Sequence, residues 1–172
     1  MKKMAGFTLV ETVILMLIIS ILAVISFPAL NQAMQHLRLR SASERLISDL
    51  RYARELALSR HGTYGIEFNT TNNTYEVFSW DGIAKTTVSD PTTGNPLLVD
   101  FDTLPGTNGV SITSANTCQG VCSSEQIRID SFGKPSDSAG TALQSAATIM
   151  LQNGIFSATV QVTPQTGYSR IS

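Results

Sequence analysis

An unbroken apolar run near the N-terminus constrains this 172-residue chain more than any other feature. Of the 18 residues from Val13 to Leu30, only Ser20, Ser26 and Pro28 are not apolar. A helix rises about 1.5 Å per residue, so this run spans roughly 27 Å, close to the ~30 Å hydrocarbon core of a bilayer. The run predicts a membrane-length helix, and the length of the whole chain allows one globular domain beside it.

Three interpretations of this segment compete. A cleaved secretory signal has a basic start and an apolar core of about 7–15 residues, whereas this run is longer and has Glu11 just before it. A plain membrane anchor fits the length but gives Glu11 no role. A charge at the edge of such a run is a functional hypothesis by default, so the third interpretation rests on the residues around Glu11.

The first eleven residues resemble the processing signal of type IV prepilins and of the pseudopilins of type II secretion. Those signals have a short basic leader that ends in Gly, then Phe-Thr-Leu-x-Glu, then a long apolar helix. Here Lys2 and Lys3 precede Gly6-Phe7-Thr8-Leu9-Val10-Glu11. The resemblance implies cleavage between Gly6 and Phe7 by a prepilin peptidase, N-methylation of Phe7, and extraction of the subunit into a filament.

Glu11 has a physical role in such a filament. A carboxylate within a bundle of apolar helices needs a partner. We expect the Phe7 amine of a neighbouring subunit to supply that partner and so to set the axial register. The alternative is a carboxylate at a helix start that interacts only with the helix dipole.

The helical pattern continues beyond Pro28, which is expected to kink the helix or weaken one of its turns. Apolar residues recur at three- and four-residue spacing, which predicts an amphipathic helix; they are Leu39, Ala42, Leu46, Leu50, Ala53 and Ala57. Arg45–Asp49 and Arg51–Glu55 are spaced as ion pairs on polar faces. Gly62 is expected to end the pattern, which gives one helix of about 50 residues, far above the average of 11–12.

After Gly62 the pattern changes to short strands. The predicted strands are 63–69, 74–80, 97–101, 110–113, 126–130, 147–152, 155–163 and 168–171. The polar turn 70–73 predicts a hairpin, and Asn153-Gly154 predicts a second hairpin with a type I′ turn. Segments 81–96 and 114–125 are expected to be loops.

The predicted fold class is α+β: a long N-terminal helix, membrane-spanning in its first half and amphipathic in its second half, packed on a β-rich C-terminal head. The predicted parts are a cleaved leader (1–6), a transmembrane or filament-core helix (7–30), an amphipathic helix (31–61) and a periplasmic head (62–172). The layout follows from the change of apolar periodicity at Gly62.

Two further motifs narrow the resemblance to the GspH/FimT family of minor pseudopilins and minor pilins. They are Asp130-Ser131-Phe132-Gly133-Lys134-Pro135 and Thr166-Gly167-Tyr168-Ser169-Arg170. The resemblance implies a non-catalytic subunit near a filament tip, anchored by a single pass in a bacterial inner membrane with its head in the periplasm. It also implies that other pilins or pseudopilins, a prepilin peptidase and an inner-membrane assembly platform are its partners.

Charge is unevenly distributed along the chain. Residues 31–60 contain six Arg and three acids, whereas residues 61–172 contain four basic and nine acidic residues. Some DNA-uptake members of the family carry a C-terminal Gly-Arg-x-Arg; Gly167 and Arg170 fit that motif, but Tyr168 replaces its first Arg. Phosphate binding needs clustered cations, so a structural role is favoured over DNA contact through Gly167 and Arg170.

The remaining candidate groups give no basis for catalysis. Cys118 and Cys122 lie in a polar loop and are predicted to form a disulfide that shapes the loop, with free thiols as the alternative. Zinc needs about four ligands, and His36 and His61 lie far from this loop in sequence. Asp100 and Asp102 share a strand face and are a candidate cation pair or simply solvated carboxylates. Without a nucleophile–base pair or a phosphate loop, no enzyme, cofactor or small-molecule substrate is expected.

Overall fold

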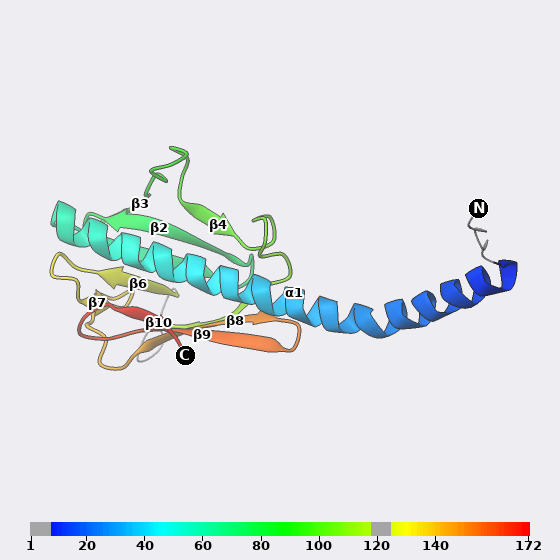
Figure 1. Cartoon of the computed structure of the whole chain (residues 1–172). Coiled ribbons are helices and arrows are strands. Elements are labelled where there is room, and N and C mark those ends of the chain that lie inside the picture. The colour runs from blue at the N-terminus through cyan, green and yellow to red at the C-terminus, as the bar shows by residue number, and fades with distance from the viewer. Residues whose placement is uncertain (1–7, 118–124) are drawn as a thin grey trace, which may run out of the picture. The chain divides into compact units, whose positions relative to one another are not determined.

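A computed structural model of the protein describes residues 8–117 and 125–172. The leader, Gly6, Phe7, Cys118 and Cys122 lie outside these described residues. The chain divides into two compact units, Met1–Gln35 and His36–Ser172. Helix α1 (Leu9–Arg60) contributes to both units, and the strands all follow it in the second unit, here called the head (Figure 1).

Helix α1 has 52 residues, which confirms the length expected from the sequence. It is continuously helical through Pro28, so the kink or weakened turn at Pro28 stays a prediction. The helix ends at Arg60, and His61 takes the left-handed conformation with φ 51°. The Gly62 N–H then donates to the carbonyl of Ala57 at 3.3 Å. His61, rather than Gly62, therefore occupies the left-handed position that commonly ends a helix.

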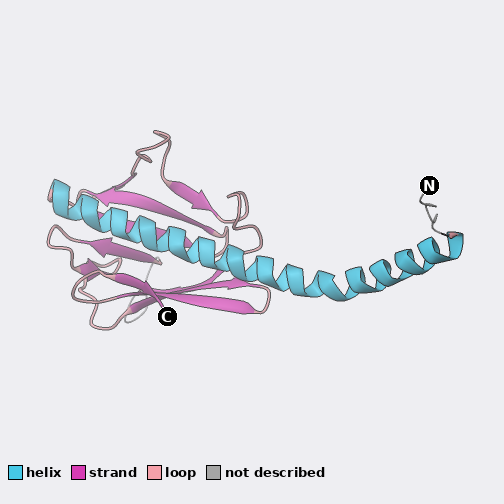
Figure 2. Cartoon of the chain, viewed as in Figure 1, coloured by secondary structure: helices cyan, strands magenta, loops and turns pink. Residues whose placement is uncertain are grey.

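The described part of the head contains ten strands, coloured magenta in Figure 2. They are β1 (Thr63–Asn69), β2 (Thr74–Trp80), β3 (Lys85–Thr87), β4 (Leu98–Asp100), β5 (Ser111–Asn116), β6 (Gln126–Ile129), β7 (Pro135–Ser136), β8 (Ala147–Asn153), β9 (Phe156–Val162) and β10 (Ser169–Ile171). One sheet has the order β3-β2-β1-β6-β7, with β4 also paired to β2, and the other has the order β10-β9-β8-β5. Every pairing between these strands is antiparallel.

Both predicted hairpins are present, but three local predictions are wrong. Strand β3 lies inside the expected loop 81–96, and β5 extends to Asn116. Asn153 pairs with Phe156, so Gly154 and Ile155 are the central turn residues, and Gly154 has φ 61°. A glycine with positive φ at the first central position is the pattern of a type II′ turn, not the expected type I′.

One hydrophobic core joins α1 to both sheets. The amphipathic stripe from Leu39 to Ala57 is buried, as its spacing predicts, and it packs with apolar residues of β1, β2, β6, β8 and β9. Gly65 lies where β1 passes close to β6, because a Cβ there would be 2.3 Å from the carbonyl oxygen of Ile127. This close approach requires glycine at the centre of the first sheet.

Candidate functional site

The N-terminal candidates are divided between described and undescribed residues. Gly6 and Phe7 lie outside the described part of the chain, so their predicted processing stays an expectation. Glu11 lies in the exposed first turn of α1, and its backbone N–H donates to Thr8 Oγ1 at 3.3 Å. Thr8 and Glu11 have the spacing of a capping box, a helix-start signal that the resemblance to prepilins did not bring out. This position leaves the Glu11 side chain exposed and compatible with either of its expected roles.

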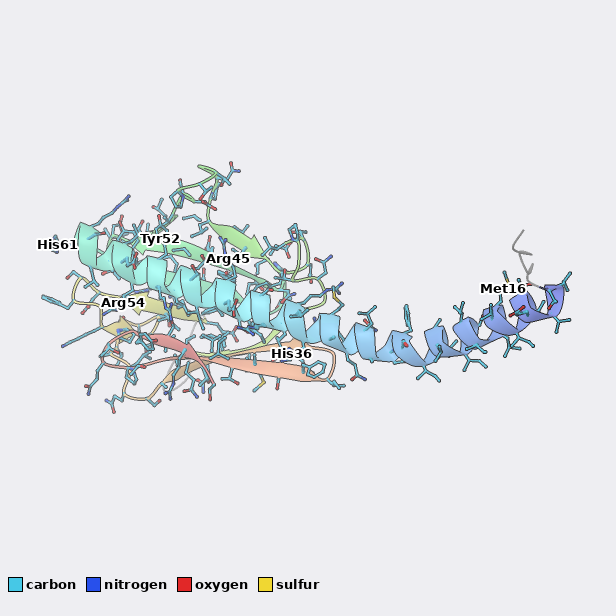
Figure 3. All side chains as sticks on the ribbon, viewed as in Figure 1. Met16, His36, Arg45, Tyr52, Arg54 and His61 are labelled. Atoms are coloured by element: carbon cyan, nitrogen blue, oxygen red, sulfur yellow. The ribbon has the colours of Figure 1, made fainter. Side chains whose placement is uncertain are left out.

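The first unit presents an apolar surface that the described residues leave uncovered. Large apolar side chains from Leu9 to Leu30 are exposed on every side of α1, and the most apolar 18-residue window is entirely unburied. Met16 in Figure 3 shows the position of such side chains on the helix. Among the described residues, α1 is the one helix long and apolar enough to cross a membrane. A helix that is apolar all round needs lipid or other helices around it.

The C-terminal candidates Gly167 and Arg170 have different structural roles. Gly167 has φ 61°, and a Cβ there would be 2.8 Å from the carbonyl oxygen of Gly133, so the fold itself requires glycine. Arg170 is exposed on β10 and donates from Nη2 to Gln161 Oε1 at 3.3 Å. The pair therefore does not form a single site, and the conformation of Gly167 is explained without any ligand.

A second arginine, Arg51, lies near Tyr168 and lines the same groove as Arg170. Tyr168 is 55% exposed, and the guanidinium carbon of Arg51 lies 5.7 Å from the centroid of its ring. Arg51 extends from α1, and it lines a groove of about 390 Å³ together with Tyr168, Arg170 and Glu44. This groove holds two cations, one acid and an exposed aromatic ring, a combination that the linear motif did not reveal.

Asp49 forms a polar contact between α1 and β2. Its Oδ2 accepts hydrogen bonds from Tyr75 Oη at 2.7 Å and from Arg45 Nε at 3.0 Å. The expected Arg45–Asp49 pair is thus confirmed, but Asp49 is only 6% exposed and does not lie on a polar face. Burial raises the pKa of Asp49, against the opposing effect of its two hydrogen bonds. Figure 3 labels Arg45 on α1.

Asp100 and Asp102 do not share a strand face, contrary to the expectation from the sequence. Asp100 ends β4, and its Oδ1 accepts the backbone N–H of Asp102 at 2.8 Å. Asp102 lies beyond the strand, and its Oδ1 accepts from Asn73 Nδ2 at 2.9 Å. Within residues 8–117 and 125–172, no group of three or more His, Cys, Asp or Glu side chains is placed to hold a metal.

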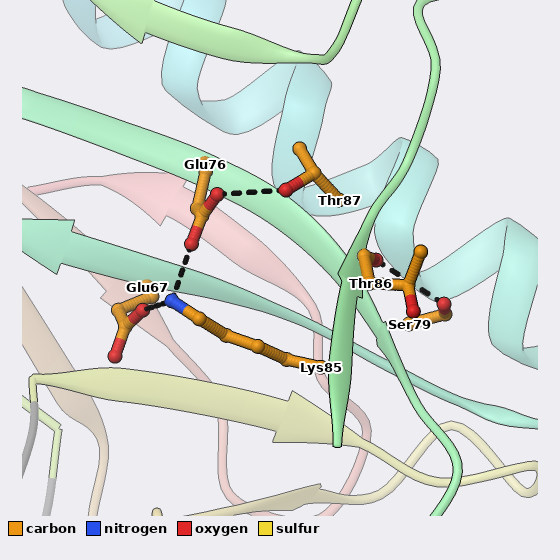
Figure 4. Close-up of polar contacts among 6 residues, drawn as sticks. All are labelled: Glu67, Glu76, Ser79, Lys85, Thr86 and Thr87. Carbon is orange, nitrogen blue, oxygen red and sulfur yellow. Dashed lines mark hydrogen bonds and ion pairs between the residues drawn. The ribbon is translucent and has the colours of Figure 1, made fainter.

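A charged cluster lies on the exposed face of the first sheet. Lys85 Nζ contacts the carboxylates of both Glu67 and Glu76, and Thr87 Oγ1 donates to Glu76 Oε2 at 2.9 Å (Figure 4). Burial alone raises the pKa of Glu76, but the hydrogen bonds from Lys85 and Thr87 outweigh it and lower the pKa. Lys85 thus bridges two neighbouring carboxylates, and the cluster joins strands β1, β2 and β3.

Comparison with known proteins agrees with this architecture. The family described as type II transport protein GspH matches residues 42–167, which include α1 from Ala42 onward and most of the head. The structure resembles the minor pseudopilin EpsH from the type 2 secretion system of Vibrio cholerae, with a TM-score of 0.56, 9% identity, and coverage of 78% of this chain and 96% of EpsH.

The structure also resembles the type IV minor pilin FimU of Pseudomonas aeruginosa PAO1, with a TM-score of 0.50 and 15% identity over 78% of this chain and 87% of FimU. At such identities the likeness shows the fold alone, a long helix on a β-rich head. No curated protein matches the sequence. The family assignment rests on the match over residues 42–167. Because this match covers most of the chain, the chain belongs to the GspH family, whose pseudopilin and minor pilin subunits are non-catalytic.

Proposed function

We propose that the chain is a minor pseudopilin or minor pilin that acts by assembly into a filament. The observation that carries this proposal is the combination of the GspH family match with Gly6-Phe7-Thr8-Leu9-Val10-Glu11 at the start of a membrane-length helix. The apolar surface of α1 supports the proposal, because it needs a bilayer before assembly and neighbouring helices afterwards. The subunit supports protein secretion or pilus biogenesis from a position near the filament tip.

The proposed pathway starts in the inner membrane, with residues 7–30 across the bilayer and the head in the periplasm. A prepilin peptidase removes residues 1–6, and the new amine of Phe7 is methylated. The assembly platform then transfers the subunit into the filament, where Glu11 meets the Phe7 amine of a neighbouring subunit. Ion pairing in an apolar bundle is favourable only when both partners are present, so this contact selects one axial register.

N-terminal processing gives the first test. The intact mass and N-terminal sequence of the full chain are compared between cells with and without prepilin peptidase, and between Gly6→Ala and the neighbouring control Ala5→Ser. We expect a methylated Phe7 at the N-terminus of the wild type and of Ala5→Ser. Peptidase-null cells and Gly6→Ala should retain the leader. A wild-type N-terminus that is the same in both strains would instead indicate an ordinary membrane-anchored protein.

Filament entry gives the second test. Glu11→Gln removes the negative charge but keeps the size of the side chain. Ser20→Ala is a matched control because, among the described residues, the Ser20 hydroxyl donates to its own helix at the carbonyl of Met16. We expect Glu11→Gln to remain in the membrane but to be depleted from sheared filaments, whereas Ser20→Ala enters them. Equal filament content of both variants would refute the role of Glu11.

A second candidate function is DNA binding on a competence pilus, favoured by the groove that contains Arg51, Tyr168 and Arg170. Aromatic rings stack on bases and arginines contact phosphates in single-strand binding sites. A gel-shift assay with Arg51→Gln, Arg170→Ala and the control Arg60→Gln tests it. Salt-sensitive binding that only the first two variants lose would support this candidate, and absence of binding by the wild type would exclude it.

A further inference from the structure

Arg128 lies on the face of the first sheet that does not join the core. Its neighbours on β6, Ile127 and Ile129, are buried in the core, so the alternation of side chains along a strand places Arg128 on the opposite face. The residue paired with it on β1 is Gly65, which has no side chain. The Arg128 side chain crosses β1 at this position and stacks on Trp80 of β2, with its guanidinium carbon 4.0 Å from a ring centroid of Trp80.

The stacked pair forms part of a cavity of about 270 Å³, here called the Trp80–Arg128 pocket. The opposite wall comes from the segment that follows β6, where Ser136 of β7 pairs with both Arg128 and Ala142. Asp130 and Lys134, from the turn between β6 and β7, also line the pocket. The pocket is therefore built by β2, β6 and β7 within the head alone.

The Arg128 guanidinium has donors available for an acceptor in the pocket. Its Nε is buried and has no hydrogen-bond partner among the described residues, and the ion pairs of these residues do not include Arg128. An unpaired buried donor on a charged group is costly. Stacking on Trp80 holds the guanidinium plane in one orientation. An arginine held in this way is suited to bidentate recognition of a planar carboxylate.

The charges around the pocket favour one carboxylate over a phosphate. Lys134 adds a second cation, and Asp130 adds one acid. The Asp130 Oδ1 accepts the backbone N–H groups of Phe132 and Lys134 at 2.9 and 2.8 Å, so this oxygen is used within its own turn. The two cations and one acid leave a single excess positive charge, which a monoanion balances. A phosphate, with a charge of about −1.5 to −2, would be repelled by Asp130.

An exposed aromatic ring beside the pocket favours a protein as the source of this carboxylate. Phe132 is 81% exposed and follows Asp130 by two residues in the same turn. Aromatic residues and arginine are the side chains enriched at protein–protein interfaces. A small free carboxylate would leave the Phe132 ring in water, whereas a carboxylate on a protein surface brings apolar neighbours that can cover it.

We propose that the Trp80–Arg128 pocket binds a carboxylate side chain of another protein. Arg128 and Lys134 contact the carboxylate, and Phe132 packs against the apolar surface around it. The residues that line this pocket do not overlap with those of the groove that contains Arg51, so the site is separate from the candidate for DNA binding. It also goes beyond the proposed function, because it requires neither leader cleavage nor entry into a filament.

Fluorescence of Trp80, the single tryptophan of the chain, tests this binding directly. The full chain in mild detergent is titrated with the peptide acetyl-Leu-Glu-Leu-amide, its neutral counterpart acetyl-Leu-Gln-Leu-amide, acetate and inorganic phosphate, all at constant ionic strength. We expect a saturable change in Trp80 emission with the Glu peptide and at least tenfold weaker binding of the other three probes. Equal binding of the two peptides, or no change with either, would refute carboxylate recognition. Equal affinity for acetate and the Glu peptide would refute a protein as the partner, and tighter binding of phosphate would refute the ligand class.

Variants assign the binding to the named side chains. Arg128→Gln should weaken the Glu peptide roughly tenfold to a hundredfold, as expected for loss of a hydrogen bond between charged groups, and Lys134→Gln roughly twofold to fivefold. Phe132→Ser should weaken the peptide but not acetate. Arg60→Gln is the control, because it removes an exposed cation at the end of α1 outside the pocket. Urea unfolding confirms that each variant is folded, and if Arg128→Gln is not, the two exposed positions 134 and 132 decide the test. Unchanged affinity in all pocket variants, or an equal loss in Arg60→Gln, would refute the site without affecting the tests of processing and filament entry.

Discussion

The hydrogen bond from Tyr75 to Asp49 gives the sharpest prediction about stability. Tyr75 is 1% exposed on β2, and its hydroxyl is 2.7 Å from Oδ2 of Asp49 on α1. Tyr75→Phe removes this donor and changes little else in volume. The Asp49 carboxylate then stays buried with Arg45 as its remaining side-chain donor. The substitution therefore isolates the polar contact between the helix and the first sheet from its apolar packing.

A hydrogen bond to a charged group contributes about 1.5–3 kcal/mol, so Tyr75→Phe should lower the free energy of unfolding by that amount. The measurement is urea unfolding of the full chain in mild detergent, followed by Trp80 fluorescence. Tyr52→Phe is the control, because Tyr52 lies half-buried on the same helix and its hydroxyl has no hydrogen bond among the described residues. The control should change stability by less than about 0.5 kcal/mol. A similar small change for Tyr75→Phe would refute the assigned role of the contact.

The pH dependence of stability gives a second test of the buried Asp49 contact. Burial raises the pKa of Asp49, which outweighs the hydrogen bonds that lower it. Such an acid binds more protons when folded, so its stabilisation is complete below its unfolded pKa of about 3.9 and is lost as pH rises through its folded pKa. The wild type should therefore lose stability relative to Asp49→Asn as the pH rises from about 3.9, the unfolded pKa, through the raised pKa of folded Asp49. A difference that is constant over this range would contradict the raised pKa.

Three substitutions in the head test the packing directly by the same unfolding assay. Gly65→Ala should cost about 3 kcal/mol or prevent folding, because its Cβ would lie 2.3 Å from the carbonyl oxygen of Ile127. Leu46→Ala should cost about 2–5 kcal/mol, since Leu46 on α1 is fully buried in the core. Gly167→Ala should cost about 1–3 kcal/mol from its positive φ and crowding alone; an unchanged stability would mean that β10 shifts freely.

The sequence predicted those parts of the fold that depend on local patterns. The 3.6-residue stripe from Leu39 to Ala57 predicted the buried face of α1 because helical neighbours are close in sequence. The turn at 70–73 predicted the first hairpin, whose Asn69 side chain accepts the backbone N–H groups of Thr71 and Asn72. Strands β3 and β7 were missed because three and two residues are too short to show a period.

Some candidate sites could be predicted from local sequence, whereas others depend on contacts between distant residues. The family motif at Gly6 to Glu11 is a local signal, so the sequence alone was sufficient to propose processing there. The burial of Asp49 was not visible, because its spacing from Arg45 matches an ordinary surface pair and its decisive partner Tyr75 is 26 residues away. The need for glycine at position 167 likewise comes from Gly133, on a different turn. Contacts made by the fold decided both cases.

The uncovered half of α1 restricts what can drive assembly. Its apolar side chains require a nonaqueous environment, yet lipid tails are as apolar as neighbouring helices, so transfer from bilayer to filament gains little from the hydrophobic effect. The free energy and the register of assembly must come mainly from close helix packing, from polar contacts and from the heads. Glu11 is the one charged side chain among the described residues between Thr8 and Leu37. We therefore expect the pairing of Glu11 to determine the axial position of the subunit in the filament. The apolar residues allow the transfer from bilayer to filament but do not select that position.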